Sequence, residues 1–443
     1  MTVTAKPHGP IPPEFAALRA LPWPDVETPA YVYDFTVVAA RIARLRAALP
    51  ANIGVHYAIK ANPFPPLLER IAPLVDGMDV ASAGELARAR DVMAAADISF
   101  AGPGKRDAEL AAALGAGVTL NLESEAEAER AFAIAGRLGV TPRLAVRVNP
   151  DFELRGSGMK MGGRASPFGV DARRAAALVR RVIEAGAEWR GFHIFAGSQA
   201  LDAASVIETQ AATVALAARL ADEAGARPPL VNLGGGFGIP YFPGDAPLDV
   251  AAVGTALGAA IQGLDTEYAV ELGRWLVGEA GVYLARVIDR KESQGETFLV
   301  VEGGLNHHLA ATGNFGTVVR RNYPVAVAHR MQDPAEEVVT IVGPLCTPLD
   351  RLADRVALPR AEGGDRIAGL WRQGEPQGVP GASAGGRIAG WSRGQPGPAR
   401  RTCSTVRWRS GHRIDWPVRN PISAAPTGVR IEIRPREISA SGG

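Results

Sequence analysis

The sequence lacks most of the features that would place it outside ordinary globular proteins. It has only two cysteines, Cys346 and Cys403, which provide neither a disulfide framework nor the spacing of a metal site. It has no apolar run long enough to span a bilayer, and its start lacks the charged and then apolar order of a secretory signal. The formal net charge is only +2 over 443 residues, which gives no electrostatic case for nucleic-acid binding. We therefore expect a cytoplasmic protein with no membrane partner.

Two further absences mark the end of the chain. No lysine follows Lys291, and no tyrosine follows Tyr323. From about Arg366 onward, tryptophans are scattered among arginine, glycine, proline and serine with the period of neither a strand nor a helix. These arginines and aromatic residues recur with no spacing, which disfavours a nucleic-acid-binding tail. A shift of reading frame would produce such an abrupt change, so we interpret residues 366–443 as an aberrant, poorly ordered tail.

The remaining chain is too long for one ordinary core, and its residue composition and periodicity divide it into segments. Residues 1–35 form a proline-rich segment, and Pro29–Phe35 within it is typical of an edge strand that packs with a second, mainly β domain over residues 286–365. Between them, residues 36–285 alternate short β-rich runs with helical stretches. The eight predicted strands are Val55–Lys60, Gly77–Ser82, Ile98–Pro103, Val118–Glu123, Arg143–Asn149, Trp189–Gly197, Leu230–Gly236 and Glu267–Arg274.

Eight strand and helix pairs are what a closed (βα)8 barrel requires, with an open doubly wound sheet as the alternative α/β arrangement. In such a barrel, functional groups gather at the carboxyl ends of the strands. The sequence places polar and glycine residues at those ends. They are Lys60, Asp79 with Ser82, Arg147 with Asn149, His193 with Ser198, Gly234–Gly236, and Glu271 with Arg274.

Lys60 and the glycine run indicate a kind of chemistry. An ammonium at the end of an apolar strand is costly to desolvate, and a neutral amine is a nucleophile toward carbonyl groups. Most lysines at strand ends are solvated, so this position alone decides nothing. The glycines at 234–236 and 238 expose backbone N–H groups that can hold a phosphate, although a tight turn explains them equally well. Together the two features predict pyridoxal 5'-phosphate as cofactor.

Two further strand-end residues fit this cofactor. Glu271 ends the eighth strand, where a carboxylate can keep a ring nitrogen protonated, although a surface helix cap is an equally ordinary role. His193 lies among apolar residues and is therefore either a satisfied core histidine or a face on which a flat ring stacks, with Ser198 as a phosphate donor.

On these residues the chain resembles the fold type III pyridoxal phosphate-dependent decarboxylases, the ornithine, arginine and diaminopimelate decarboxylases. The matching motifs occur in the family order between residues 30 and about 365, with Leu272 where proline is usual. They are Tyr57-Ala-Ile-Lys60-Ala-Asn62, Asp79-Val-Ala-Ser-Ala-Gly-Glu85, His193 with Gly197-Ser198, Gly234-Gly-Gly-Phe-Gly238, Glu271-Leu-Gly-Arg274 and Gly343-Pro-Leu-Cys-Thr-Pro-Leu-Asp350.

The resemblance implies a set of roles. Lys60 anchors the cofactor covalently, His193 stacks on its ring, and Glu271 pairs with the ring nitrogen. Cys346 supports protonation of the product, and Arg274 and Asp350 contact the substrate, with Asp350 holding its distal amine. The family delivers Cys346 and Asp350 into the partner's site across a head-to-tail homodimer. The remaining cofactor contacts are Ser198, Gly235, Gly236 and Arg274 around the phosphate, and Asp79, Glu85 and Arg147 elsewhere.

The resemblance leaves the substrate open. Asp350 favours a diaminopimelate-like or another diamino or basic amino acid, whereas Thr347 replaces the acidic residue that commonly follows the cysteine. The loop at 156–163 is similar to an exosortase-associated subgroup, in which an acyl carrier protein is a possible partner. A racemase is disfavoured, because similar racemases place arginine where Glu271 stands. A catalytically impaired or regulatory homologue remains an alternative, because the family's Gly-Ala-Tyr-Gly motif is missing after residue 365.

Overall fold

The computed structural model describes residues 4–11, 26–156, 159–160, 162–307, 321–369, 387–391 and 404–407. Its strands form two large sheets, one of them a barrel and the other part of a β domain, and a third sheet of two short strands. In the described part of the chain, no helix is long and apolar enough to cross a membrane.

The eight predicted barrel strands are confirmed, all parallel to their neighbours. The pairing of the fourth strand with the fifth closes the ring, which excludes the open doubly wound sheet. Their interior positions are apolar and buried, as a closed parallel sheet covered by helices requires. The strands are β2 (Ile53–Ala58), β3 (Gly77–Val80), β4 (Ile98–Phe100), β5 (Thr119–Leu122), β6 (Arg143–Asn149), β9 (Glu188–Ile194), β11 (Leu230–Asn232) and β12 (Glu267–Leu272).

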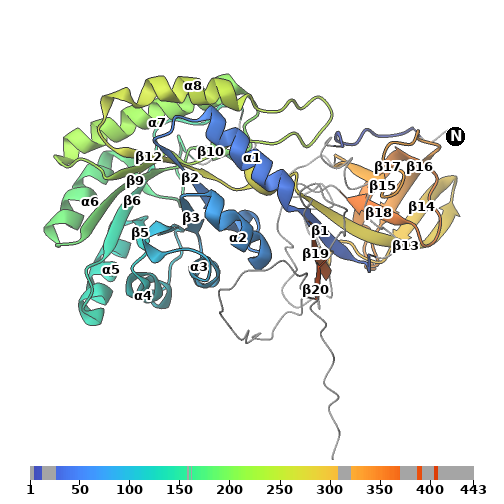
Figure 1. Ribbon diagram of the computed structural model, residues 1–443, viewed down its shortest axis with the longest axis horizontal. Helices are drawn as coiled ribbons and strands as arrows, with labels where there is room; N and C mark the ends of the chain where they lie inside the picture. Colours follow the sequence, from blue (N-terminus) through green and yellow to red (C-terminus); the bar gives the residue numbers. More distant parts are fainter. Residues whose placement is uncertain are drawn as a thin grey trace, which may run out of the picture. The chain divides into compact units, whose positions relative to one another are not determined.

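Helices cover the outside of the barrel (Figure 1). Serine and aspartate side chains start several of them: Ser82 Oγ accepts the Glu85 N–H, and Ser124 Oγ accepts the Glu127 N–H. The helices are α1 (Phe35–Ala48), α2 (Pro65–Ile71), α3 (Ala83–Arg90), α4 (Asp107–Ala116), α5 (Glu125–Leu138), α6 (Ala172–Glu184), α7 (Ala203–Ala224), α8 (Val250–Ala260) and α9 (Arg274–Val277). Two short strands between them, β7 (Met159–Lys160) and β10 (Gly197–Ser198), pair with each other, and β8 (Val170–Asp171) extends beside β6.

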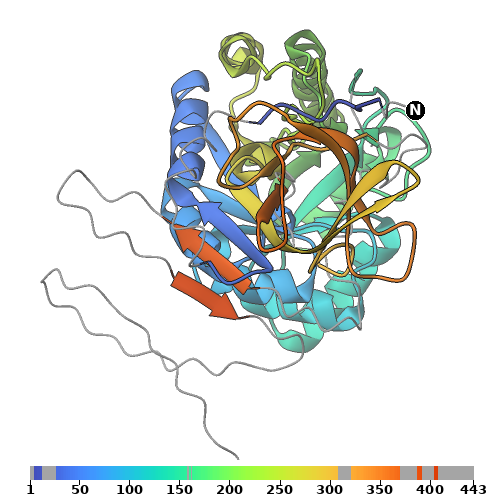
Figure 2. The same ribbon diagram turned by 90° about the vertical axis from the view of Figure 1, so that its right-hand side faces the viewer.

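The second large sheet is mainly antiparallel and begins with β1 (Ala30–Asp34). The prediction that this segment is an edge strand is wrong, because β1 pairs with β13 on one side and with β19 on the other (Figure 2). The other strands are β13 (Gly281–Ser293), β14 (Glu296–Val301), β15 (Val325–Val327), β16 (Glu337–Val342), β17 (Arg351–Leu358), β18 (Arg366–Gly369), β19 (Arg387–Trp391) and β20 (Ser404–Arg407).

The first residues of the interpreted tail belong to this sheet. β18 pairs with both β13 and β15, and its Ile367 and Ala368 are buried. From the sequence, we interpret residues 366–443 as an aberrant tail. The first four of these residues form β18 and extend the sheet, so the ordered part of the chain continues past residue 365. Apart from β18, β19 and β20, the tail lies outside the described residues, and so does Cys403.

Candidate active site

A cavity of about 340 Å³ opens at the carboxyl ends of the barrel strands. Its wall contains residues near the carboxyl ends of six different strands, which is the arrangement that the barrel prediction required. The predicted site residues in this wall are Lys60, Asp79, Arg147, His193 and Glu271.

Lys60 differs from its prediction. β2 ends at Ala58, and Lys60 lies on the 3-10 turn Ile59–Ala61, where 57% of its side chain is exposed. The expected desolvation of the ammonium is therefore absent, because the turn carries the side chain out of the apolar strand. Lys60 Nζ lies 3.6 Å from Glu271 Oε1 and 5.6 Å from the ring centre of Phe195. The amine is thus accessible from the cavity and held beside a carboxylate.

Glu271 and His193 are buried at the base of the cavity. Burial alone would raise the pKa of Glu271, but the Lys60 ammonium and His193 outweigh it and hold this pKa well below its usual range. His193 Nε2 lies 2.9 Å from Glu271 Oε2. The two atoms are therefore in contact, although among the described residues neither makes a hydrogen bond of regular geometry. The site therefore contains a buried, charged carboxylate, one oxygen of which has only the His193 contact in the part of the chain that the structure describes.

Asp79 reaches the cavity from β3 and contacts a histidine that was not predicted. His56 Nδ1, on β2, lies 3.2 Å from Asp79 Oδ2. Burial would lower the pKa of His56, but Asp79, helped by Glu271 and Asp76, outweighs burial and raises it. The other oxygen of Asp79 has no hydrogen-bonding partner among the residues that the structure describes. Asp79 thus combines a structural contact with an unused acceptor.

At the glycines of residues 234–238, the backbone lies too close to neighbouring segments for a larger side chain. A Cβ on Gly235 would lie 2.0 Å from the Glu271 carbonyl oxygen, and Gly236 has a left-handed φ of 89°. Arg274 Nη1 lies 3.4 Å from Gln199 Oε1 and 3.3 Å from the Tyr241 hydroxyl. These glycines, Arg274 and Ser198 do not line the 340 Å³ cavity. The phosphate cradle therefore stays a prediction.

Three other predicted residues also lie outside the wall of this cavity. Glu85 accepts the Ala81 N–H at 2.7 Å, and burial raises its pKa although that bond and the Lys60 ammonium oppose the shift. Cys346 is exposed on the loop 343–350. Asp350 is engaged within its own loop. It is 1% exposed, and its carboxylate accepts the N–H groups of Leu305 at 2.7 Å and Leu345 at 2.8 Å.

The role of Asp350 in holding a distal amine stays a prediction, and the geometry shows what else this carboxylate does. Two backbone donors and burial use part of the acceptor capacity of this carboxylate within its own loop. Cβ atoms on Gly304 and Gly343 would also meet its oxygen atoms, so the chain closes tightly around it. These contacts show that Asp350 stabilises the loop that carries Cys346.

The wall of the cavity also contains residues that the sequence analysis missed. The polar ones are Lys105 and Glu109, and the aromatic ones are Phe168 and Phe195. Lys105 ends Gly102-Pro-Gly-Lys105 directly after β4, so the strand-end rule that selected Lys60 also selects this lysine. Phe168 and Phe195 carried no comparable signal, because isolated aromatic residues are common in cores.

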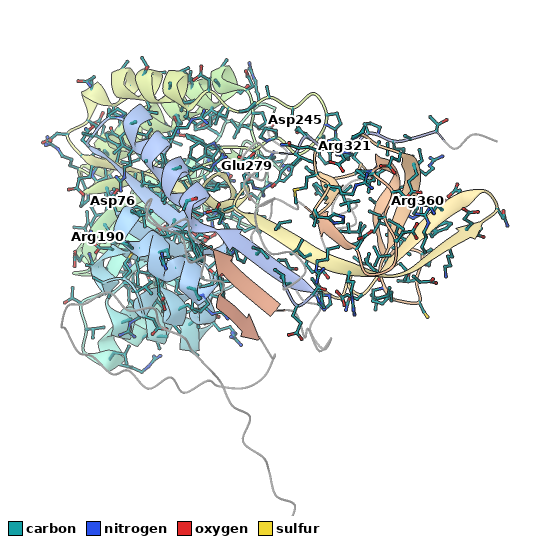
Figure 3. All side chains as sticks on the ribbon, turned by 45° about the vertical axis from the view of Figure 1, so that its right-hand side comes forward. Asp76, Arg190, Asp245, Glu279, Arg321 and Arg360 are labelled. Atoms are coloured by element: carbon teal, nitrogen blue, oxygen red, sulfur yellow. The ribbon has the colours of Figure 1, made fainter. Side chains whose placement is uncertain are left out.

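A second cavity of about 420 Å³ lies at the amino ends of the same strands. Asp76 and Arg190, labelled in Figure 3, belong to its wall. None of the predicted site residues lines it, and polar groups at this end of a barrel usually serve stability. Among the described residues, no group of three metal-ligating side chains occurs. The 340 Å³ cavity is therefore the candidate site.

Comparison with known proteins finds relatives among the pyridoxal-dependent decarboxylases. Residues 36–278 match the family model described as pyridoxal-dependent decarboxylase, pyridoxal binding domain. L-glutamyl-[BtrI acyl-carrier protein] decarboxylase of Niallia circulans is 35% identical over 78% of this chain and 83% of its own length. Diaminopimelate decarboxylase of Aquifex aeolicus is 31% identical over 77% of this chain and 81% of its own length. The solved structure of diaminopimelate decarboxylase from Helicobacter pylori complexed with L-lysine gives a TM-score of 0.75 at 25% identity. The match covers 87% of this chain and 95% of that one.

The residues present fit pyridoxal phosphate. The Glu271 oxygen that contacts only His193 among the described residues is a buried acceptor that suits a protonated ring nitrogen. Lys60 is an accessible amine within 3.6 Å of the same carboxylate, as a covalent anchor for the cofactor requires. Asp79 and Arg147 supply an acceptor and a cation elsewhere in the wall.

Proposed function

The chain belongs to the pyridoxal-dependent decarboxylases, and we propose that its substrate is an amino acid whose far end carries no free ammonium, such as a glutamyl group tethered to a carrier protein. Removal of carbon dioxide from an amino acid with pyridoxal phosphate is the activity of the family. The proposal concerns which amino acid is bound, and it replaces the diaminopimelate-like substrate that Asp350 favoured in the sequence.

The observation that carries this proposal is the engagement of Asp350. The resemblance assigns recognition of the far end of the substrate to the loop 343–350. In this loop Asp350 is buried and accepts two backbone N–H groups, and Thr347 is neutral. The loop exposes Leu345 and Leu349 instead. A desolvated ammonium needs a paired carboxylate, whereas an uncharged chain packs against leucine without that cost.

A second candidate substrate is diaminopimelate. It is supported by the similarity to diaminopimelate decarboxylases, one of which is complexed with L-lysine, a diamino acid. The relative that acts on a carrier-bound glutamyl group is more similar in sequence, 35% against 31%. We place the carrier-bound substrate first because it agrees with the chemistry of the loop 343–350.

The proposed roles of the side chains follow from their geometry. Bound pyridoxal phosphate supplies an electron sink for the electron pair that remains when carbon dioxide leaves. Lys60 offers an exposed amine as covalent anchor, and Glu271 offers a buried negative charge that favours a proton on an adjacent nitrogen. His193, on the wall beside Glu271, offers a flat surface for a ring. Cys346 offers an exposed thiol as a proton donor to the product.

The assembly and location are further parts of the proposal. We propose a head-to-tail homodimer, in which the loop that carries Cys346 completes the cavity of the partner copy. An acyl carrier protein is then a transient partner that presents the substrate. The scarcity of cysteine supports a reducing, cytoplasmic location.

Carbon dioxide release from a panel of substrates tests the substrate proposal. The panel contains free diaminopimelate, ornithine, arginine, lysine and glutamate, and glutamate as a pantetheine thioester, with Lys60→Ala as the inactive control. We expect kcat/KM for the thioester to exceed that for diaminopimelate by at least about 10-fold. A higher value for any diamino acid would overturn the substrate proposal. Release from none of them would favour the catalytically impaired homologue.

A further inference from the structure

A buried carboxylate lies behind the wall of the candidate active site and contacts three separate segments of the barrel. Glu123 follows β5 directly and is 6% exposed. Its Oε1 accepts the backbone N–H of Gly102 and, at 2.9 Å, Arg147 Nη1. Its Oε2 accepts the N–H of Gly169 at 3.1 Å. The donors come from the loop after β4, from β6 itself and from the residue before β8, so one side chain joins neighbouring strand ends.

The loop after β4 is fixed from behind by a second buried pair. Lys105 is 4% exposed, donates from Nζ to the Gly102 carbonyl oxygen, and lies 2.7 Å from Glu127 Oε1 on α5. Breaking a buried pair of charges is costly because it leaves one charge unpaired. The loop residues Ala101–Lys105 line the 340 Å³ cavity. The Lys105 and Glu127 pair therefore holds this part of the wall in place.

Arg147 is the member of the network that brings a guanidinium group to the cavity wall. Its guanidinium carbon lies 5.2 Å from the ring centre of Phe168, and both residues line the cavity. Its positive charge also contributes to lowering the pKa of Glu271. Burial would raise the pKa of Glu123, but Arg147 and Lys105 outweigh burial and lower it, so Glu123 is ionised at neutral pH. Arg147 thus has a negative partner behind it and an aromatic ring beside it.

We propose that Glu123 is a positioning residue of the cofactor site, which acts by holding Arg147 in the wall as a cation presented to the anionic pyridoxal phosphate. Without the Glu123 carboxylate, Arg147 would still be attracted to Glu271, whose pKa it already helps to lower and which the site needs for the ring nitrogen. Glu123 touches neither cofactor nor substrate in this proposal. The inference rests on the proposed location of the cofactor and is independent of which amino acid is decarboxylated.

A double-mutant cycle on cofactor binding tests the inference. The dissociation constant of pyridoxal phosphate is measured by absorbance titration of the apoprotein, without substrate, for wild type, Glu123→Gln, Arg147→Met and the double variant. Glu125→Gln is the matched control, since this exposed carboxylate two residues further on pairs only with Arg174 among the contacts described for it. We expect Glu123→Gln to weaken binding at least about 10-fold in wild type and less than 2-fold in the Arg147→Met background.

The cycle separates positioning from a merely structural role. If the losses from Glu123→Gln and Arg147→Met multiply, or if Glu123→Gln binds the cofactor like wild type, the inference is overturned. If Glu123→Gln gives too little folded protein, Glu123→Asp takes its place in the cycle, because it keeps the charge and shortens the reach to Arg147. A wild-type chain that fails to bind the cofactor would overturn the site and the inference together, whereas an unexpected substrate in the carbon dioxide assay would leave both intact.

Discussion

Glu271 has the most distinctive environment of any residue in the site. It is buried at the end of β12, yet the Lys60 ammonium 3.6 Å away and His193 2.9 Å away keep it ionised at neutral pH. A buried charge with an acceptor oxygen that makes no regular hydrogen bond among the described residues is costly to maintain in the absence of a ligand. A cationic nitrogen of a bound cofactor would pair with this oxygen and offset the cost of burying the charge.

Glu271→Gln tests this reading at the level of one residue. The amide keeps the shape of the side chain and removes its charge, so a protonated ring nitrogen loses its partner. We expect kcat for carbon dioxide release to fall by about 10² to 10³-fold. Glu267→Gln, on the same strand but exposed, is the control and should retain full activity. An active Glu271→Gln variant would remove the proposed role of this carboxylate.

His56 should make the stability of the barrel depend on pH. Its pKa is raised in the folded state, against the opposition of burial, by Asp79, Glu271 and Asp76. A raised pKa stabilises the fold fully below the unfolded value of 6.5, and this contribution is lost as pH rises through the folded value. His56→Gln should therefore cost more unfolding free energy at about pH 5.5 than at about pH 8.5. Urea titrations at both pH values measure the difference, with the exposed His329→Gln as control. An equal cost at both values would contradict the assignment.

At the scale of elements, the ends of the barrel strands and one loop of the β domain carry the site. The barrel was predictable from sequence because eight buried parallel strands give separate apolar runs, each followed by polar or glycine residues. The solvation of Lys60 was not predictable, since it depends on a single 3-10 turn after β2. The burial of Asp350 was missed because its donors, Leu305 and Leu345, include one that is remote in sequence. Pairing of β1 with β19 was missed for the same reason.

Asp350→Ala distinguishes a loop-fixing residue from a substrate-binding one. The substitution leaves two partly buried N–H groups without this acceptor, at a cost of about 1 to 3 kcal/mol in unfolding free energy. Urea denaturation measures this cost. Asp333→Ala, which removes only an ion pair of partly exposed side chains with Arg330, should cost less than about 0.5 kcal/mol. A stable Asp350→Ala variant with a raised KM would support the substrate role that the sequence suggested.

At the scale of the whole molecule, the loop with Cys346 and the cavity with Lys60 are separate parts of one chain. The described cavity wall contains Lys60 and Glu271 but neither Cys346 nor any other residue of the loop 343–350. The proposed head-to-tail homodimer accounts for this separation, because each copy then supplies its loop to the other. The head-to-tail homodimer was predicted from the family resemblance and not from the residue pattern, because contacts between two copies leave no periodic pattern along one chain.

Mixing two inactive variants tests the shared site. Lys60→Ala lacks the anchor, and Cys346→Ala lacks the thiol. When the two are unfolded and refolded together, half of the dimers pair one chain of each kind, and each such dimer has one intact site. We expect recovery of about a quarter of the wild-type activity. No recovery above the separately refolded variants would show that each site is formed within one chain.

The central claim is that the cavity around Lys60 holds the cofactor. The most direct measurement is borohydride reduction of the protein loaded with pyridoxal phosphate, followed by digestion and mass spectrometry of the peptides. The account predicts one pyridoxyl group on Lys60, whose amine is exposed beside Glu271, and none on Lys105, whose ammonium is buried against Glu127. Attachment to Lys105 or to another lysine, or no attachment at all, would contradict it.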